Sequence, residues 1–163
     1  VFYVSPIKGD NSNSLVSYKD DRELQAMEVN MFSIDDFVKN KNLQKLAFIK
    51  IDVEGHELSV LKGAENFINK HHPTLIIEIE QRHHKDINIE SVFDSFKQKG
   101  YHCYYYSKKQ SQLFSYGNKT HLTNTKEYFG KIDYINNYIF IHETNKMIQS
   151  IEVINKTISE KIK

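Results

Sequence analysis

The stretch IKIDVEGHELSVLKGA, from Ile49 to Ala64, joins an apolar strand pattern to a cluster of acidic side chains. Carboxylates stand at Asp52, Glu54 and Glu57, where the apolar run gives way to helical spacing. An unpaired carboxylate is costly inside a protein, so these positions predict an edge of the sheet that faces solvent or a ligand. Glu54 and Glu57 also stand near the start of a helix, where acids stabilise the helix dipole; this explanation is equally simple for Glu57, whereas for Glu54 we favour a functional role.

The segments around this stretch alternate between strand and helix patterns. Apolar runs predict strands at 46–53 and 74–80, each followed by apolar residues at helical spacing, at 54–70 and 87–100. Pro73 ends the first helix. Strand, helix, strand, helix with short connections is typical of a parallel sheet with helices on its faces. The sequence therefore predicts an α/β fold.

The flanking segments predict further elements. Upstream, the sequence favours short strands at 1–6 and 26–32 and a helix that Ser33 caps. Downstream, we expect strands at 101–109, 112–117 and 134–143 and an amphipathic helix over 144–163. We therefore divide the chain into a domain over 1–143 and a C-terminal helix over 144–163.

Composition argues against several classes of protein. The chain has 22 basic and 21 acidic residues among its 163, and a nucleic-acid-binding protein normally has a basic excess. Cys103 is the only cysteine, which excludes an internal disulfide and fits a reducing compartment. No apolar run is as long as a transmembrane helix, and no secretory signal opens the chain. We expect a cytoplasmic protein that binds neither membranes nor nucleic acid.

The carboxyl ends of the two central strands are the predicted ligand site. Ligands of open α/β sheets bind outside these ends, where Asp52 and Glu78 fall. Gly55 permits a tight turn or the close approach of a ligand. His56 is either a general base or a solvated residue of the first helical turn. His83 and His84 follow the second strand, in a loop whose place would let it border a substrate site and which we interpret as a solvated surface loop.

The run IKIDVEGHELSVLKGAENFI resembles the central motif of the FkbM family of S-adenosylmethionine-dependent methyltransferases. The family pattern is an apolar strand, then IDVEG, a further acid, and LKGA in the next helix, and each part is present here. Pro73 before an apolar strand that ends in Glu78 also matches, as do Gly100-Tyr101 and the segment NSNSL that contains Ser14. The resemblance covers residues 1–105 and, loosely, the last strand near 138–142.

This resemblance implies a class I methyltransferase fold, a Rossmann-like sheet that is mostly parallel with an antiparallel last strand. The activity it implies is transfer of a methyl group from S-adenosylmethionine to a hydroxyl of a sugar, glycan or secondary metabolite. Asp52 is then the candidate base or orienting group, His56 is its weaker rival, and Glu78 completes the catalytic set. The implied cofactor-binding residues are Ser14, Asp52, Glu54 and Gly55. A second possibility is that Asp52 and Glu78 share a Mg²⁺ ion that lowers the hydroxyl pKa.

One departure from the family pattern affects the expected activity. The family's first strand and its glycine-rich cofactor loop do not precede Val1, so we expect an N-terminally truncated domain. Without its usual neighbour, the strand at 46–53 becomes an apolar sheet edge, which favours a homo-oligomer or pairing with another chain. The alternative to an enzyme is therefore an inactive remnant that acts as an interaction module. A stand-alone metal hydrolase explains the acids but not the LKGA helix.

Overall fold

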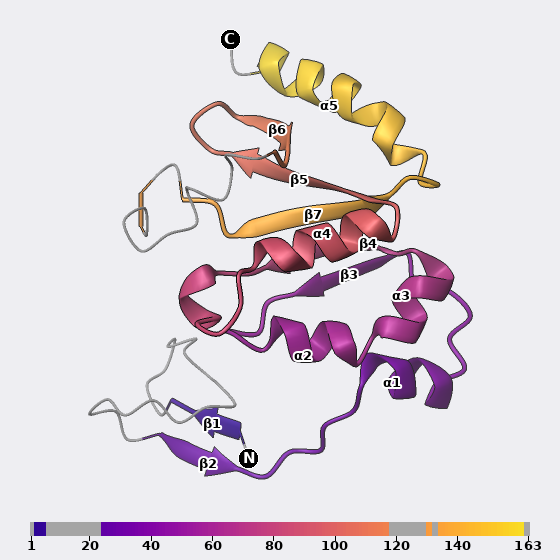
Figure 1. Ribbon diagram of the computed structural model, residues 1–163, viewed down its shortest axis with the longest axis vertical. Coiled ribbons are helices and arrows are strands. Elements are labelled where there is room, and N and C mark those ends of the chain that lie inside the picture. Colours follow the sequence, from indigo (N-terminus) through magenta and orange to yellow (C-terminus); the bar gives the residue numbers. More distant parts are fainter. Residues whose placement is uncertain (1, 6–23, 118–129, 132–133, 162–163) are drawn as a thin grey trace.

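The computed structural model describes residues 2–5, 24–117, 130–131 and 134–161 and has a mixed α/β architecture (Figure 1). A five-stranded sheet forms its centre, in the order β3-β4-β7-β5-β6. The strands are β3 (Phe48–Ile51), β4 (Thr74–Glu78), β5 (Tyr101–Ser107), β6 (Gln112–Ser115) and β7 (Asn137–His142). No helix of the described residues is long and apolar enough to cross a membrane.

The direction of the strands meets the prediction only in part. β3 and β4 are neighbours and run parallel, as predicted, with Ile51 opposite Ile77. The last strand, β7, is antiparallel to both β4 and β5, so β3, β4 and β5 share one direction. β5 and β6 form an antiparallel pair. Because β7 lies between β4 and β5, the sheet is mixed rather than mostly parallel by its hydrogen-bonded pairs.

The N-terminal strands do not join the central sheet. β1 (Phe2–Val4) and β2 (Gln25–Met27) form an antiparallel pair of their own. The expected strand over 26–32 is thus shifted toward the N-terminus and shortened, and residues 28–32 form no strand and are exposed. Without a neighbouring strand, their apolar side chains gain little from an extended conformation.

The helices are α1 (Ile34–Asn40), α2 (Glu57–Lys62), α3 (Glu65–His71), α4 (Glu90–Gln98) and α5 (Met147–Lys161), with a 3-10 turn, η1 (Gln81–His83). Ser33 caps α1 as predicted, since its Oγ accepts a hydrogen bond of 3.0 Å from the Asp36 N–H.

The single helix predicted over 54–70 is wrong, because it divides into α2 and α3 at Gly63 and Ala64. The Gly63 carbonyl accepts a hydrogen bond of 2.9 Å from the Asp35 N–H of α1. The Asp35 carboxylate in turn accepts the backbone N–H groups of Asn66 and Phe67, at 3.1 and 2.8 Å. An acid from α1 therefore satisfies the free N–H groups at the start of α3, a contact that local sequence patterns do not contain.

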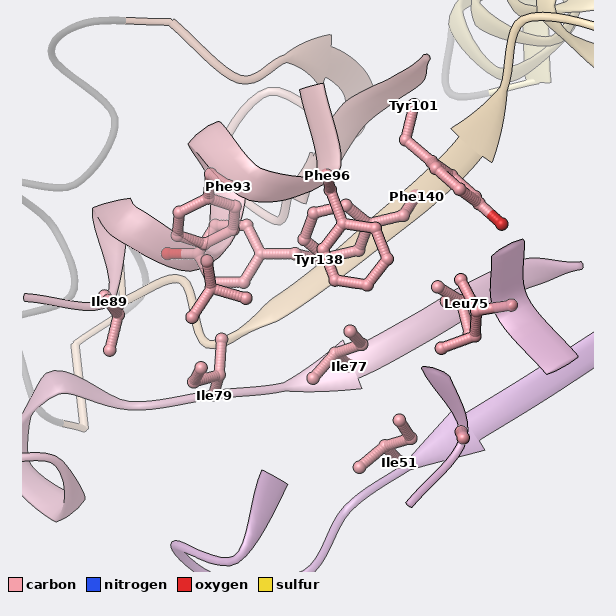
Figure 2. Packing of buried hydrophobic residues seen from close by; sticks show 13 residues of the cluster. Ile51, Leu75, Ile77, Ile79, Ile89, Phe93, Phe96, Tyr101, Tyr138 and Phe140 are labelled. Atoms are coloured by element: carbon pink, nitrogen blue, oxygen red, sulfur yellow. The ribbon is translucent and has the colours of Figure 1, made fainter. Parts of the chain in front are cut away.

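The core lies between the central sheet and the helices α3 and α4 (Figure 2). Ile51, Leu75 and Ile77 of β3 and β4 are at most 2% exposed. The rings of Phe93 and Phe96 from α4 pack on those of Tyr138 and Phe140 from β7, with centroids 4.8 Å and 4.6 Å apart for the pairs Phe93–Tyr138 and Phe96–Phe140. Each fully buried aromatic side chain of this kind contributes about 1.5–3 kcal/mol by transfer from water.

The other edge of β3 has no strand partner among the described residues. Phe48, which begins β3, is 52% exposed, and Lys50 is exposed on the same face. The strand predicted to form an apolar edge is therefore an edge strand in this part of the chain.

Candidate functional site

Asp52 and Glu78 lie side by side where β3 and β4 end. Glu78 is the last residue of β4, and Asp52 directly follows Ile51, whose partner in β4 is Ile77. Adjacent strands are about 4.8 Å apart, so both carboxylates project from one short edge of the sheet. We call this edge, formed by residues 52–57 and 78–84, the rim. The Nζ of Lys50 forms an ion pair of 2.8 Å with Asp52, and both side chains are nearly half exposed, at 43% and 46%.

Glu78 is held by two amides from the start of β7. Asn136 donates to its Oε1 at 2.8 Å, and Asn137 donates to its Oε2 at 3.0 Å. Burial raises the pKa of Glu78, and the nearby charge of Asp52 raises it further, whereas the hydrogen bond from Asn137 lowers it. The net result is a pKa above the usual range, which makes Glu78 a stronger proton acceptor than an ordinary glutamate.

Glu80 has a different environment from Glu78, two residues away. It is 5% exposed and accepts hydrogen bonds from Arg82 and from the hydroxyl of Tyr134. Asn136 donates to it as well, at 3.3 Å, and so contacts both acids. Burial works to raise the pKa of Glu80, but the three hydrogen-bond donors outweigh it and lower the pKa. Glu80 therefore stays ionised and serves as a buried anchor for the rim.

The turn after Asp52 has an unusual backbone. Glu54 and Gly55 have φ angles of +49° and +96°, so two successive residues adopt positive φ. A Cβ on Gly55 would come within 3.1 Å of the His83 Cβ, so the glycine serves a tight turn against its own chain. Glu54 is exposed, and the half-buried His56 occupies the N-cap position before α2 without a side-chain capping bond.

The third acid of the motif, Glu57, is buried. It is 2% exposed, and its Oε1 accepts a hydrogen bond of 2.9 Å from the Gly55 N–H. Its Oε2 lies 2.8 Å from the Nε2 of His84, which is 7% exposed. The interpretation of His84 as a solvated loop residue is therefore wrong. The loop folds back over the rim because His84 provides a polar partner for a carboxylate that would otherwise be buried alone.

The structure thus brings together Asp52, Glu54, Gly55, His56 and Glu78 at one rim, and their chemical roles stay predictions. Ser14 lies outside the described residues. Sequence reasoning missed the support that Asn136 and Asn137 give to Glu78 and the burial of Glu57. The paired asparagines just before an apolar strand were an available signal for the first, but nothing local marked the second.

Within the described ranges, no group of three or more histidine, cysteine or acidic side chains is arranged to hold a metal ion. Both oxygens of Glu78 already accept amide hydrogen bonds, and Asp52 is paired with Lys50. The expected Mg²⁺ site therefore has no support in this geometry.

Comparison with known families agrees with the motif at the rim. The model of the methyltransferase FkbM domain matches residues 2–103, which include β3, α2, α3, β4 and α4. The chain belongs to the FkbM methyltransferase family. No curated protein and no solved structure was found to match it. Because the chain belongs to this family, we interpret the residues of the rim in terms of methyl transfer.

Proposed function

We propose that this FkbM-family chain transfers a methyl group from S-adenosylmethionine to a hydroxyl oxygen of a sugar, glycan or secondary metabolite. The observation that carries the proposal is the pairing of Asp52 and Glu78 on adjacent parallel strands, inside the segment that matches the family. Sites of open α/β folds lie at such strand ends.

The groups at the rim fit the cofactor chemically. S-adenosylmethionine offers hydroxyl and amino donors, and the exposed carboxylates of Asp52 and Glu54 are acceptors. When bound, the cofactor supplies a methyl group on a positively charged sulfur. Acidic side chains near that position favour the positive charge, and we assign Asp52 and Glu54 to cofactor contact on this basis.

The carboxylates of Glu78 and Asp52 have different roles toward the acceptor hydroxyl. The raised pKa of Glu78 suits it to take the proton of the hydroxyl as the new bond forms. Asp52, which forms an ion pair with Lys50, orients the hydroxyl in line with the methyl group. His56 stays a weaker candidate for the base, since it stands at the start of α2 on the same rim.

The strand order supports a class I sheet as the finer description of the fold. The resemblance implies an antiparallel last strand, and β7 lies antiparallel between β4 and β5. In that arrangement β3 is an inner strand, with a neighbour on the edge that is unpaired in the described part of this chain. We infer that this edge takes up a further strand, from this protein or from a partner.

Binding and turnover together test the proposal. Calorimetric titration with S-adenosylmethionine is followed by methyl-transfer assays with radiolabelled cofactor on a panel of sugars and glycans. We expect binding and transfer, and Glu78→Gln should reduce kcat by about a hundredfold or more, as for loss of a general base. The control, Glu65→Gln, removes an exposed carboxylate that pairs with Lys99 far from the rim, and should retain activity. Failure of the wild-type chain to bind the cofactor would refute the proposal for this chain.

A second function, interaction without catalysis, is favoured by one observation. Phe48 on the edge strand β3 is half exposed, and exposed edges readily pair with other strands. A chain that associates through β3 and binds no S-adenosylmethionine would support this second function instead.

A further inference from the structure

The buried pair Glu57–His84 joins the two loops that form the rim. Glu57 belongs to the first turn of α2, after β3, and His84 follows η1, after β4. The distance of 2.8 Å between Glu57 Oε2 and His84 Nε2 is a full hydrogen bond between side chains that are 2% and 5% exposed. The loops that follow β3 and β4, next to Asp52 and Glu78, are therefore connected through the interior as well as through the sheet.

Glu57 also fixes one peptide group of the turn. Its Oε1 accepts the Gly55 N–H at 2.9 Å, and the described residues contain no cis peptide bond. In a trans peptide the N–H and C=O groups point in opposite directions. The Glu54 carbonyl therefore points away from the buried pair, which fixes the ψ angle of Glu54, a residue whose φ is +49°. Such a conformation persists only where surrounding contacts determine it.

Contacts from the loop with His83 and His84 also hold the turn at Glu54 and Gly55 in place. The space beside Gly55 is filled by His83, whose Cβ lies 3.1 Å from where a side chain would begin. The neighbouring His84 carbonyl accepts a hydrogen bond of 2.7 Å from Gln81 Nε2, which holds the loop that presents both histidines. The turn is thus held by Glu57 from within and by the His83–His84 loop from the side.

We propose that Glu57 and His84 are positioning residues for methyl transfer, which hold the turn from Asp52 to His56 in the conformation that the cofactor and acceptor require. The proposal rests on the proposed function. Two N–H groups face Glu57, one from the Gly55 backbone and one from the His84 ring, and each needs an acceptor. Only a carboxylate at position 57 offers a separate oxygen to each of them. The third acid of the motif therefore acts through the backbone rather than on the substrate.

Substitution of Glu57 or His84 by glutamine changes the hydrogen bonds of the pair while it keeps the side-chain size nearly constant. Glu57→Gln leaves one acceptor oxygen for two donors and turns an N–H group toward another donor. His84→Gln keeps an N–H donor for Glu57 in a side chain of similar length. We expect Glu57→Gln to lower kcat about 10- to 100-fold with a smaller change in KM, because a small misplacement of reacting groups has that effect. We expect His84→Gln to retain most of the activity and His84→Ala to lose it.

Two further measurements complete the test. Hydrogen exchange of the Gly55 amide should be slow in the wild-type chain and in His84→Gln, and fast in Glu57→Gln. The control Glu65→Gln should match the wild type in both assays, since Glu65 is exposed and pairs with Lys99 at 3.3 Å. If Glu57→Gln does not fold, the comparison of turnover in His84→Gln and His84→Ala tests the positioning role.

Equal turnover in the wild type, Glu57→Gln and His84→Ala would overturn the inference and leave the proposed function intact. Equal losses in His84→Gln and His84→Ala would also overturn it, because the glutamine variant keeps an N–H donor for Glu57 and the loss of activity would then not follow the hydrogen bond. A wild-type chain that neither binds S-adenosylmethionine nor transfers methyl groups would refute the proposed function first, and the inference with it.

Discussion

Substitution of Gly55 by alanine tests the tight turn at the rim. Gly55 has a φ of +96°, and an added Cβ would lie 3.1 Å from the Cβ of His83. A positive φ costs an alanine about 1–2 kcal/mol. The close contact adds about 1–3 kcal/mol, as in other overpacked sites. We therefore expect Gly55→Ala to lower the free energy of unfolding by about 2–5 kcal/mol, the sum of these two terms.

Gly130 provides a matched control for this substitution. Its φ is +75°, but no atom of the described residues lies within 4 Å of a Cβ added there. Gly130→Ala should therefore show only the backbone cost of about 1–2 kcal/mol. Urea denaturation of both variants, followed by circular dichroism, gives the two free energies of unfolding. Equal losses in the two variants would refute the claim that His83 crowds the turn. No loss at all in Gly55→Ala would refute the turn geometry itself.

The remaining predictions concern the rim, a histidine pair and the sheet edge. Asn137→Ala removes a hydrogen bond that lowers the pKa of Glu78. The acid limb of the pH–rate profile should therefore move to higher pH. An unchanged acid limb would argue against Glu78 as the base. Burial is the main cause that lowers the pKa of His142 below the usual 6.5, and the charge of the stacked His72 lowers it further. The unfolded chain therefore binds more protons than the folded chain, and the free energy of unfolding should fall as the pH drops through about 6.5. His142→Gln should flatten this dependence in urea titrations, and an equally steep dependence would exclude His142 as its source. Phe48→Lys should reduce self-association through the β3 edge in size-exclusion chromatography, whereas a wild-type monomer with every amide from Phe48 to Val53 protected from hydrogen exchange would contradict an open edge.

The individual elements were largely predictable from local patterns. The apolar runs gave β3 and β4, Ser33 gave the start of α1, and the acid at the end of each strand gave the rim. A parallel pair follows from strand, helix and strand joined by short connections, so the approach of Asp52 to Glu78 was also predictable. These features depend on residues that are close in the sequence.

The divided helix and the support of Glu78 were not predictable in the same way. The break between α2 and α3 depends on Asp35, which lies about thirty residues earlier and caps α3 from α1. Glu78 is held by Asn136 and Asn137, which reach it only because β7 pairs with β4. Hydrogen bonds between distant segments leave no periodic signal for a sequence pattern to reveal.

By itself, the sequence determined that this chain has an α/β fold with acids at the ends of two strands, and its IDVEG and LKGA motifs pointed to the FkbM family that the family model then matched. Only the tertiary structure distinguished the three acids of that motif. Asp52 is exposed beside Lys50, Glu54 is exposed in a turn with positive φ, and Glu57 is buried against His84. The physical reason is that burial of a carboxylate depends on whether a partner from elsewhere in the chain reaches it, which the fold decides.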